Sequence, residues 1–248
     1  MEARLPARRL DDVHVPDEQA DSVPPVTSSD QAIALWRALR DEVRRNSPRG
    51  RILIAVDGED GSGKTRFADH LAAVFAEDGT RVLRASIDDF HRSRSERYRR
   101  GRTSPEGFYL DSYDYDAFRR LLVEPFRTGA ADGVRLAAFD LAADRPVDAP
   151  SVSVPDDALL IVDGIFLNRP ELRGIWHWSV WLDAPLDVRY ARMAERDGCD
   201  ADPAADSNRR YREGQELYLK EAAPRTAASV IVDNTDPASP RRVYADFC

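Results

Sequence analysis

The sequence predicts an α/β fold in which a parallel sheet carries helices on both faces, giving three layers. Short apolar runs such as RILIAVD (51–57) and ALLIVDG (158–164) are typical of strands buried on both faces of a parallel sheet. Segments with apolar residues at helical spacing alternate with these runs along the chain. A glycine-rich stretch, GEDGSGKT (58–65), follows the first strand directly.

The composition favours a small-molecule partner. The 248 residues are 42% hydrophobic, enough for a sizeable core, and the net charge of −8 disfavours nonspecific binding to nucleic acid or anionic membranes. No apolar run reaches the roughly 18 residues of a membrane span. Cys199 and Cys248 stand far apart and the four histidines are scattered, which argues against a disulfide framework or a zinc site. These features predict a cytoplasmic protein.

The chain divides into a short arm and one larger unit. Residues 1–29 are rich in Pro, Asp, Ser and Arg and lack hydrophobic periodicity, which predicts a flexible N-terminal arm. The remainder, 30–248, has no internal repeat or long linker and is interpreted as one domain. Its first element is an amphipathic helix over 29–45, which the sequence SPRG (47–50) ends.

The other elements follow in alternation. The strand at 51–57 leads through the glycine-rich stretch into a helix over 65–77, again with apolar residues at helical spacing. Further strands are expected at 81–87, 134–140, 158–164, 178–183 and 229–234, and further helices over 112–126, 185–197 and 209–222.

The glycine-rich stretch fits the pattern G-x-x-x-x-G-K-[ST] at every fixed position. It consists of Gly58, Glu59, Asp60, Gly61, Ser62, Gly63, Lys64 and Thr65. The glycines permit backbone angles that let successive N–H groups wrap phosphate oxygens, and the dipole of the following helix adds to the attraction. Lys64 is expected to reach the β and γ phosphates, and the Thr65 hydroxyl to hold Mg²⁺. The strand before and the helix after disfavour a chance match, so we predict a P-loop NTPase fold that binds ATP and Mg²⁺.

A nucleotide site also needs a carboxylate near the metal, usually at the end of a neighbouring strand. Asp163 meets this requirement, because it follows four apolar residues in a row. The alternative is an Asp that only caps a turn at the end of the strand. Asp57 is the competing carboxylate, but its place just before the loop suits a structural hydrogen bond better.

The segment after the second predicted strand indicates an acceptor site. Asp88 stands at the carboxyl end of that strand, where open α/β sheets bind ligands, and could accept the proton of an attacking hydroxyl. Six arginines follow between Arg92 and Arg102. They could steer an anionic substrate or form only a solvated loop.

Several motifs together resemble one known family. They are GEDGSGKT, the S-x-D-x-F of Ser86, Asp88 and Phe90, YDYDAF, FD at 139–140, VDG at 162–164, R-x-x-x-R at Arg192 and Arg196, and VIVDN. In this order they are similar to the uridine kinase group of P-loop kinases, whose wider relatives include phosphoribulokinase and pantothenate kinase. The resemblance runs from about Arg51 to Asn234.

The resemblance implies roles for several residues. Asp88 becomes the base and touches the metal, and Asp163 takes the acidic metal position. Asp114 takes the position that grips the ribose hydroxyls, with a one-residue gap that leaves Asp111 open, and Phe139 belongs to the acceptor site. Where the family commonly has a histidine that reads the pyrimidine, this chain has Asp144, so base selection must differ.

Arg192 and Arg196 fall where the lid helix of the family offers charge to the transferring phosphoryl. The alternative for both is a solvated helix face paired with Glu195 and Asp197. The polar stretch from Cys199 to Ser207 is expected to belong to a mobile lid, near 189–212, that closes over bound nucleotide.

The sequence therefore predicts an ATP-dependent, Mg²⁺-dependent kinase with a small-molecule acceptor and no nucleic-acid or membrane partner. The favoured acceptor is the 5′-hydroxyl of a pyrimidine ribonucleoside, uridine or cytidine. The alternatives are a kinase of another small alcohol, such as a pantothenate-like or secondary metabolite, and a non-catalytic protein that responds to ATP. The preference between ATP and GTP stays open, as does the oligomeric state, with a homo-oligomer among the options.

Overall fold

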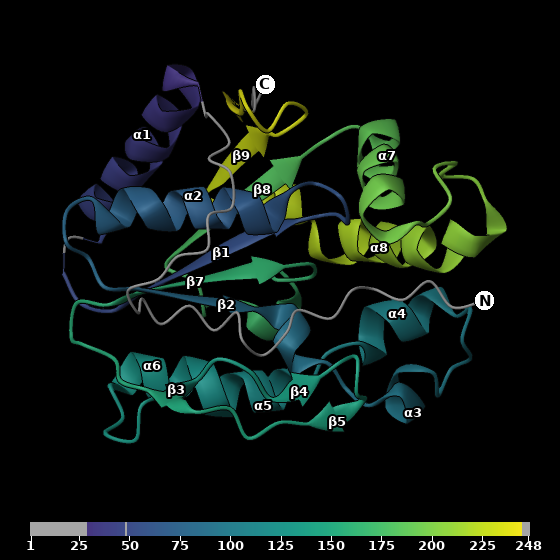
Figure 1. The fold of residues 1–248 in the computed structure, drawn as a ribbon, viewed down its shortest axis with the longest axis horizontal. Helices are drawn as coiled ribbons and strands as arrows, with labels where there is room; N and C mark the ends of the chain where they lie inside the picture. The colour runs from purple at the N-terminus through teal and green to yellow at the C-terminus, as the bar shows by residue number, and fades with distance from the viewer. Residues whose placement is uncertain (1–28, 48, 245–248) are drawn as a thin grey trace.

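The core of the fold is a six-stranded sheet in the order β10-β9-β8-β1-β7-β2, in which only β10 is antiparallel to its neighbour. The computed structural model describes residues 29–47 and 49–244 (Figure 1). The strands are β1 (Ile52–Gly58), β2 (Val82–Ser86), β7 (Leu159–Gly164), β8 (Trp178–Asp183), β9 (Val230–Asp233) and β10 (Arg241–Val243). The predicted α/β class with a mostly parallel sheet is confirmed.

Two helices cover one face of this sheet, α1 (Asp30–Asn46) and α2 (Lys64–Ala76). Alternate side chains of β1, Ile52, Ile54 and Val56, are buried against them, as the two-residue period of a strand requires. Trp36 of α1 is 2% exposed and packs edge-on against Phe67 of α2. The first helix is therefore part of the core.

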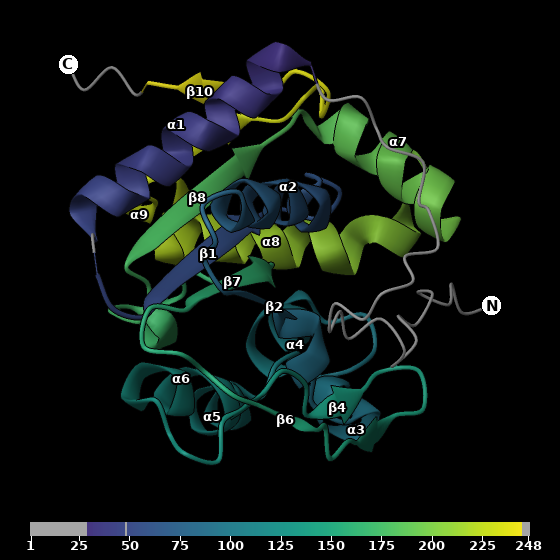
Figure 2. The ribbon, with the colours of Figure 1, turned by 60° about the vertical axis from the view of Figure 1, so that its left-hand side comes forward.

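The other face is covered by α4 (Pro105–Asp111), by the helical run from Tyr115 to Thr128 and by α8 (Arg209–Ala222) (Figure 2). The intervening β1 side chains, Leu53 and Ala55, belong to this second cluster. Helices thus lie on both faces, which gives the three layers that the alternating pattern predicts.

One predicted strand is wrong. Residues 134–140 do not join the main sheet but form two separate two-residue strands, β3 (Val134–Arg135) and β4 (Phe139–Asp140). Each pairs antiparallel in a small ribbon, with β6 (Ser151–Val152) and β5 (Arg145–Pro146) respectively. The apolar residues of this segment pack on the helical layer below the sheet, so burial there accounts for the pattern that resembled a strand.

The predicted helix over 112–126 is present but begins later and changes its winding. It consists of α5 (Tyr115–Phe118), a π-helical turn η3 (Arg119–Val123) and α6 (Glu124–Thr128). Asp114 caps its first turn by accepting the Ala117 N–H at 2.9 Å. Pro125 lies at the start of α6, where its missing N–H is tolerated.

The remaining helices are α3 (Arg94–Arg97), α7 (Leu186–Asp197) and α9 (Pro224–Ala227), with the short turns η2 (Ile87–Phe90), η4 (Pro170–Leu172) and η5 (Asp206–Asn208). The prediction for residues 1–29 lies outside the described residues except at Ser29, whose side chain caps α1 by accepting the Ala32 N–H. Within residues 29–47 and 49–244, no helix is long and apolar enough to cross a membrane.

Candidate active site

A large cleft opens at the carboxyl ends of β1, β7 and β2, and its volume is about 2180 Å³. Open parallel sheets bind ligands at this edge, because the loops that follow the strands converge there. The P-loop, the turn η2, β4 and the facing ends of α7 and α8 all line it. Of the predicted site residues, Lys64, Thr65, Asp88, Asp163, Phe139, Arg192 and Arg196 line this cleft, as do Asp60, Gly61 and Gly63.

The P-loop has a backbone that other residues could not adopt. Gly61 has φ +77°, and a Cβ there would stand 2.4 Å from the Arg189 carbonyl oxygen. Gly63 has φ +89°, and its Cβ would stand 2.7 Å from Asn234 Nδ2. Asn234 is buried and donates this amide to the Ser62 carbonyl at 2.6 Å. Neighbouring elements thus hold the loop in the concave form that suits a phosphate.

Lys64 crosses the mouth of this loop. Its Nζ donates to the Glu59 carbonyl at 2.9 Å, which holds the ammonium over the loop. Burial lowers the pKa of Lys64, and the nearby carboxylates, Asp60 first among them, act in the opposite direction. A phosphate entering the loop would supply the negative charge that favours the protonated lysine.

The fold brings Thr65 and Asp163, both predicted to hold the metal, into contact. The Thr65 hydroxyl donates to Asp163 Oδ2 at 2.7 Å, which joins the start of α2 to the end of β7. These are oxygen donors, which Mg²⁺ prefers, and Mg²⁺ usually completes its shell with phosphates and water. Within the described part of the chain, no group of three or more His, Cys, Asp or Glu side chains could hold a metal alone. The pair fits a Mg²⁺ that arrives with the nucleotide.

The second oxygen of Asp163 is bound by a residue that sequence reasoning missed. Arg84 Nη2 lies 2.9 Å from Asp163 Oδ1, and Arg84 Nη1 donates to the Ile161 carbonyl at 2.9 Å. Arg84 also contacts Asp69 of α2 at 3.1 Å. Arg84 therefore orients Asp163 so that Oδ2 faces Thr65. A charged residue between the apolar residues Leu83 and Ala85 of strand β2 is the sequence signal that could have revealed it.

Asp88 is exposed at the start of η2 and faces the cleft. Tyr113 donates its hydroxyl to Asp88 Oδ1 at 2.8 Å, and burial and the Asp88 charge raise the Tyr113 pKa well above its ordinary value. The tyrosine therefore remains a donor. The other oxygen of Asp88, Oδ2, makes no hydrogen bond within the described residues. A carboxylate oriented on one side and open on the other suits a base.

Asp57 is fully buried directly before the P-loop. It accepts from the Gly58 N–H at 2.8 Å, from Asn168 Nδ2 at 2.7 Å and from the Tyr218 hydroxyl. Burial raises its pKa, and these hydrogen bonds act against that shift. Asp57 also accepts the Asn168 backbone N–H at 3.1 Å and does not contact Thr65, so its geometry is that of the structural hydrogen bond expected from its position.

The three arginines of α7 near the P-loop have different partners. Arg189 is buried and its guanidinium lies 3.0 Å from Glu59, so it holds the loop. Arg192 donates to the Gly61 carbonyl at 3.2 Å and to the Thr235 carbonyl at 2.8 Å. Arg196 forms a two-bond ion pair with Asp197, at 2.8 and 2.6 Å. Arg192 and Arg196 line the cleft, whereas Arg189, which sequence reasoning missed, supports the loop from outside.

The three carboxylates that the sequence suggests as contacts for the acceptor are bound to other groups of the protein. Asp114 caps α5, and Asp111 is 7% exposed and paired with Arg99 and Arg100 at 3.1 and 2.9 Å. Asp144 accepts the Arg94 N–H at 2.7 Å and lies 3.6 Å from the Arg97 guanidinium. None of the three lines the cleft, whereas Phe139 does. Sugar and base contacts by Asp114 and Asp144 therefore stay predictions.

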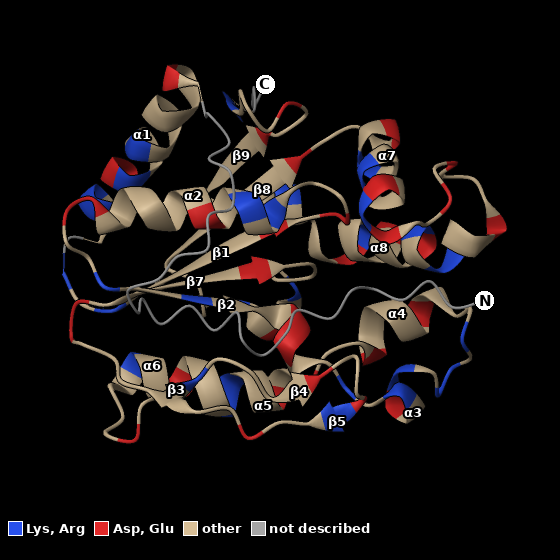
Figure 3. Cartoon of the chain, viewed as in Figure 1, with Lys and Arg blue, Asp and Glu red and all other residues tan. Residues whose placement is uncertain are grey.

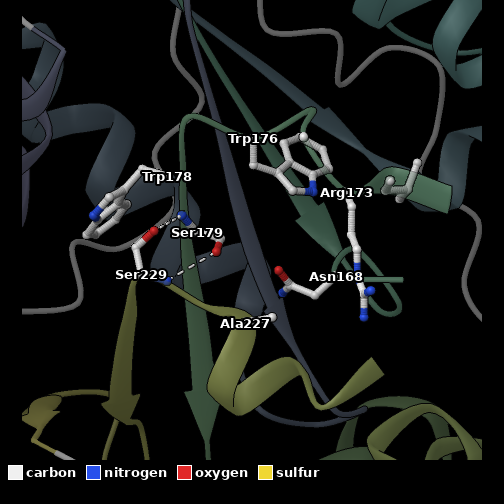
Figure 4. A pocket seen from close by; sticks show the side chains of 9 residues that line it. Asn168, Arg173, Trp176, Trp178, Ser179, Ala227 and Ser229 are labelled. Carbon is white, nitrogen blue, oxygen red and sulfur yellow. Dashed lines mark hydrogen bonds between the residues drawn. The ribbon is translucent and has the colours of Figure 1, made fainter. Parts of the chain in front are cut away.

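A smaller cavity of about 150 Å³ lies between the loop at 168–176, β8 and β9 (Figure 4). The hydroxyl oxygens of its two serines already have hydrogen-bond partners, because Ser179 and Ser229 each accept the backbone N–H of the other. Its lining shares no residue with the large cleft. The large cleft, which holds the P-loop, is the candidate active site.

Comparison with known proteins tests the family. No family model matches the chain. The uridine kinase of Leuconostoc citreum is 26% identical over 151 residues, which are 59% of this chain and 68% of that protein. The uridine kinase of Aliivibrio fischeri strain MJ11 is 24% identical over 164 residues, which are 61% of this chain and 70% of that protein.

Solved structures agree with these sequences. A protein described as a possible uridine kinase from Bacillus stearothermophilus matches with a TM-score of 0.58 at 24% identity, covering 78% of this chain and 98% of that one. A protein described as a candidate fructose transport system kinase, from Silicibacter sp. TM1040, matches with a TM-score of 0.57 at 26% identity, covering 79% of this chain and 94% of that one. These similarities in sequence and fold support a uridine kinase-like P-loop kinase, as the sequence predicts. The kinase relatives imply ATP as the phosphate donor, and the prediction of an ATP-dependent kinase is confirmed at this level.

Proposed function

We propose that this chain transfers the γ-phosphoryl group of ATP to a hydroxyl of a small molecule bound in the cleft. The observation that carries the proposal is the placement of Asp88, which is exposed beside the P-loop edge of the sheet and oriented by Tyr113. A protein that only binds nucleotide needs the P-loop but has no use for an oriented carboxylate in the same cleft. The surroundings of Asp88 therefore favour an enzyme over an ATP-responsive switch.

Each residue of the site has a role that is usual in phosphoryl transfer, where positioning and charge neutralisation supply most of the catalysis. Backbone N–H groups of 58–65 and Lys64 would hold the phosphates. Thr65 and Asp163 would hold Mg²⁺, which neutralises charge on the phosphates when bound. Asp88 would accept the proton of the attacking hydroxyl at Oδ2, because Oδ1 is engaged by Tyr113. Asp88 is also proposed to touch the metal.

Arg192 and Arg196 are proposed to neutralise charge on the transferring group when the lid closes. Arg192 already donates to the Gly61 carbonyl of the P-loop, so its guanidinium stands beside the phosphate site. Arg196 would exchange Asp197 for a phosphate oxygen, which requires that its ion pair break. The Arg196 side chain is 64% exposed, so it can leave Asp197 and turn toward the cleft.

Two acceptor classes remain as proposals. The names of the curated relatives support the 5′-hydroxyl of uridine or cytidine, which is the acceptor favoured from the sequence. The internal pairing of Asp144 supports another small alcohol, because no hydrogen-bond reader of a pyrimidine is in place there. The name of the fructose transport system kinase is a second support for this alternative.

The deciding experiment is ADP formation by the purified protein with ATP, Mg²⁺ and each of a panel of alcohols that includes uridine, cytidine, fructose and pantothenate. At least one acceptor should raise ADP formation well above the rate without acceptor, and Lys64→Ala should remove that increase. Equal ADP formation with and without every acceptor would contradict the kinase proposal and support an ATP-responsive switch.

A further inference from the structure

We propose that the acceptor is an anionic alcohol, a molecule that carries a carboxylate or phosphate group besides the hydroxyl that is phosphorylated. The inference deepens the proposed function and rests on it. Its basis is a set of three cleft-lining side chains, Arg94, Arg97 and Arg210, called here the acceptor-end arginines. They come from α3 and from the first turn of α8, which lie on the same side of the molecule in Figure 3.

Arg210 is the decisive residue. It is only 8% exposed, yet no carboxylate of residues 29–47 and 49–244 lies within 4.0 Å of its guanidinium. Its Nη1 donates to the Arg102 carbonyl at 2.8 Å and its Nη2 reaches the Arg97 carbonyl at 3.5 Å. Its Nε is buried and has no hydrogen-bond partner among the described residues. A permanently charged group thus lines the cleft, and both of its hydrogen bonds within the described residues go to backbone carbonyls, so only two of its five donors are used there.

The surroundings of Arg210 compensate its charge only in part. Tyr98, Phe108 and Tyr211 present rings at 4.7, 5.8 and 5.9 Å from the guanidinium carbon. Rings at these distances attract a cation weakly compared with a carboxylate. Because burying an unpaired charge is costly, folded proteins normally give a buried arginine an anion. A ligand anion in the cleft would fill this role for Arg210.

The other two acceptor-end arginines add positive charge. Among the described residues, no carboxylate lies within 4.0 Å of the Arg94 side chain, which is exposed at the start of α3. Arg97 has one carboxylate neighbour, Asp144, at 3.6 Å. Three guanidinium groups therefore share a single carboxylate partner. Asp89 and Asp140 also line the cleft, and one Asp140 oxygen already accepts the N–H groups of its own turn, Ala142 and Ala143.

The chemistry of arginine selects the ligand class. A guanidinium offers only donors, in a planar fork that matches the paired oxygens of a carboxylate or a phosphate. A pyrimidine edge presents a donor as well as acceptors, and the Asp144 carboxylate, the acceptor expected for that donor, is engaged by Arg94 and Arg97. The acceptor-end arginines therefore fit an anionic group better than a neutral base.

The first test compares matched acceptors that differ in the anionic group: D-glycerate with glycerol, pantothenate with pantothenyl alcohol, and uridine 3′-monophosphate with uridine. The better substrates should be anionic. Arg210→Gln should raise KM for the anionic acceptor roughly 10- to 100-fold, the range for a lost charge-assisted hydrogen bond, and change the neutral partner less than about 3-fold. Lys220→Gln, which removes a charge from the exposed end of α8, is the control and should change neither.

The second test needs no turnover. With the P-loop filled by a non-hydrolysable ATP analogue and Mg²⁺, inorganic phosphate or acetate should raise the Tm of the wild type above that in sodium chloride of equal ionic strength. The anion that raises the Tm, phosphate or acetate, shows whether the anionic group of the acceptor is a phosphate or a carboxylate. Arg210→Gln should abolish the increase while retaining the shift caused by the ATP analogue, which also shows that the variant folds.

The two tests separate the two proposals. If no acceptor in any pair stimulates ADP formation, the kinase proposal fails, and anion binding is still judged by the Tm. Neutral acceptors that work as well as their anionic partners would overturn the inference of an anionic acceptor and leave the kinase proposal intact. The inference would also be overturned if the anions did not raise the Tm of the wild type. An equal rise in the Tm of Arg210→Gln would overturn it too.

Discussion

The cleft combines a P-loop backbone that neighbouring residues hold in place with side chains positioned to bind a charged ligand. Gly61 and Gly63 cannot be replaced without collision with Arg189 or Asn234, and Lys64 spans the loop that these glycines shape. Arg84 holds one oxygen of Asp163 and Tyr113 holds one oxygen of Asp88, so each carboxylate keeps one defined oxygen for its proposed role. Orientation by a fixed neighbour is what catalysis by positioning requires.

Replacement of Lys64 by Ala tests the P-loop. The variant removes the one cation that spans the loop and leaves the backbone donors of 58–65 in place. Turnover should fall roughly 10²- to 10³-fold, the range for loss of one preorganised donor to the transition state. Circular dichroism should be unchanged. Wild-type turnover in this variant would exclude the P-loop as the working phosphate site.

Replacement of Asp88 by Asn tests the base. Asparagine keeps the size of the side chain but loses the basic oxygen and the negative charge. Acceptor-dependent ADP formation should fall roughly 10²- to 10⁴-fold, while ATP affinity measured by calorimetry stays similar or tightens because repulsion of the phosphates is reduced.

The partner variant Tyr113→Phe removes only the hydroxyl that donates to Asp88 and should give a smaller loss, since the carboxylate remains. If Asp88→Asn transfers phosphate at a near-normal rate, Asp88 is not the base, and the reading of the protein as an ATP-responsive switch gains support.

Among the secondary-structure elements, α7, α8 and the segment between them face the P-loop across the cleft. Gly198, Cys199, Asp200, Asp206 and Ser207 all line it. The segment is mostly exposed, and several of its hydrogen bonds are local, such as that of the Ala204 N–H to Asp202. Segments with few buried contacts are the ones that proteins use as lids.

Amide hydrogen exchange tests the lid. Amides from Cys199 to Ser207 should exchange more slowly when a non-hydrolysable ATP analogue and an acceptor are bound together than in the free protein. The amides of β1, which are buried in the sheet, serve as the internal reference. Identical exchange of 199–207 in both samples would remove the lid proposal.

The helix before the sheet, α1, is tested through Trp36. Trp36→Ala removes a side chain that is 2% exposed and packs on Phe67 and His70, so the free energy of unfolding should fall by about 3–5 kcal/mol. Trp36→Phe keeps much of this packing and should cost less. Chemical denaturation measures both. A loss below about 1 kcal/mol for Trp36→Ala would mean that α1 adds little to the core.

At the scale of the whole molecule, the histidines make stability depend on pH. Burial lowers the pKa of His70, His91 and His177, so the native state holds each of them neutral more strongly than the unfolded chain does. His177 Nδ1 also accepts the Leu53 N–H at 3.0 Å, which a protonated ring cannot do. The stability from these neutral rings is present above about pH 6.5 and is lost as pH falls through the lowered values.

The Tm should therefore decrease between about pH 7.5 and pH 5.5, above the range in which most carboxylates titrate. His177→Asn keeps an acceptor and does not titrate, so its Tm should decrease less over the same range. Differential scanning calorimetry of both proteins gives the comparison. A flat Tm in the wild type, or the same slope in both, would show that the histidines do not control this dependence.

The amino-acid sequence was enough to predict the β1, P-loop and α2 unit and the succession of β1, β2, β7, β8 and β9 along the chain, and it named Thr65 and Asp163, which the fold brings together. These features follow from local rules, because strand and helix periods, glycine conformations and the convergence of parallel strand ends need no knowledge of distant packing. The same rules misplaced 134–140, since an apolar run reports burial but not the partner that buries it.

Which side chains from distant parts of the sequence contact one another depends on the tertiary structure. Tyr113 reaches Asp88 from 25 residues away, Arg84 reaches Asp163 from 79, and Arg210 reaches the Arg102 carbonyl from 108. The same sequence pattern permits an arginine to be solvated, paired or buried beside a cleft, because its charge is constant and only the fold determines the nearest carboxylate. Arg210 lies in the cleft without a carboxylate partner among residues 29–47 and 49–244, and the packing of α8 on α4 places it there.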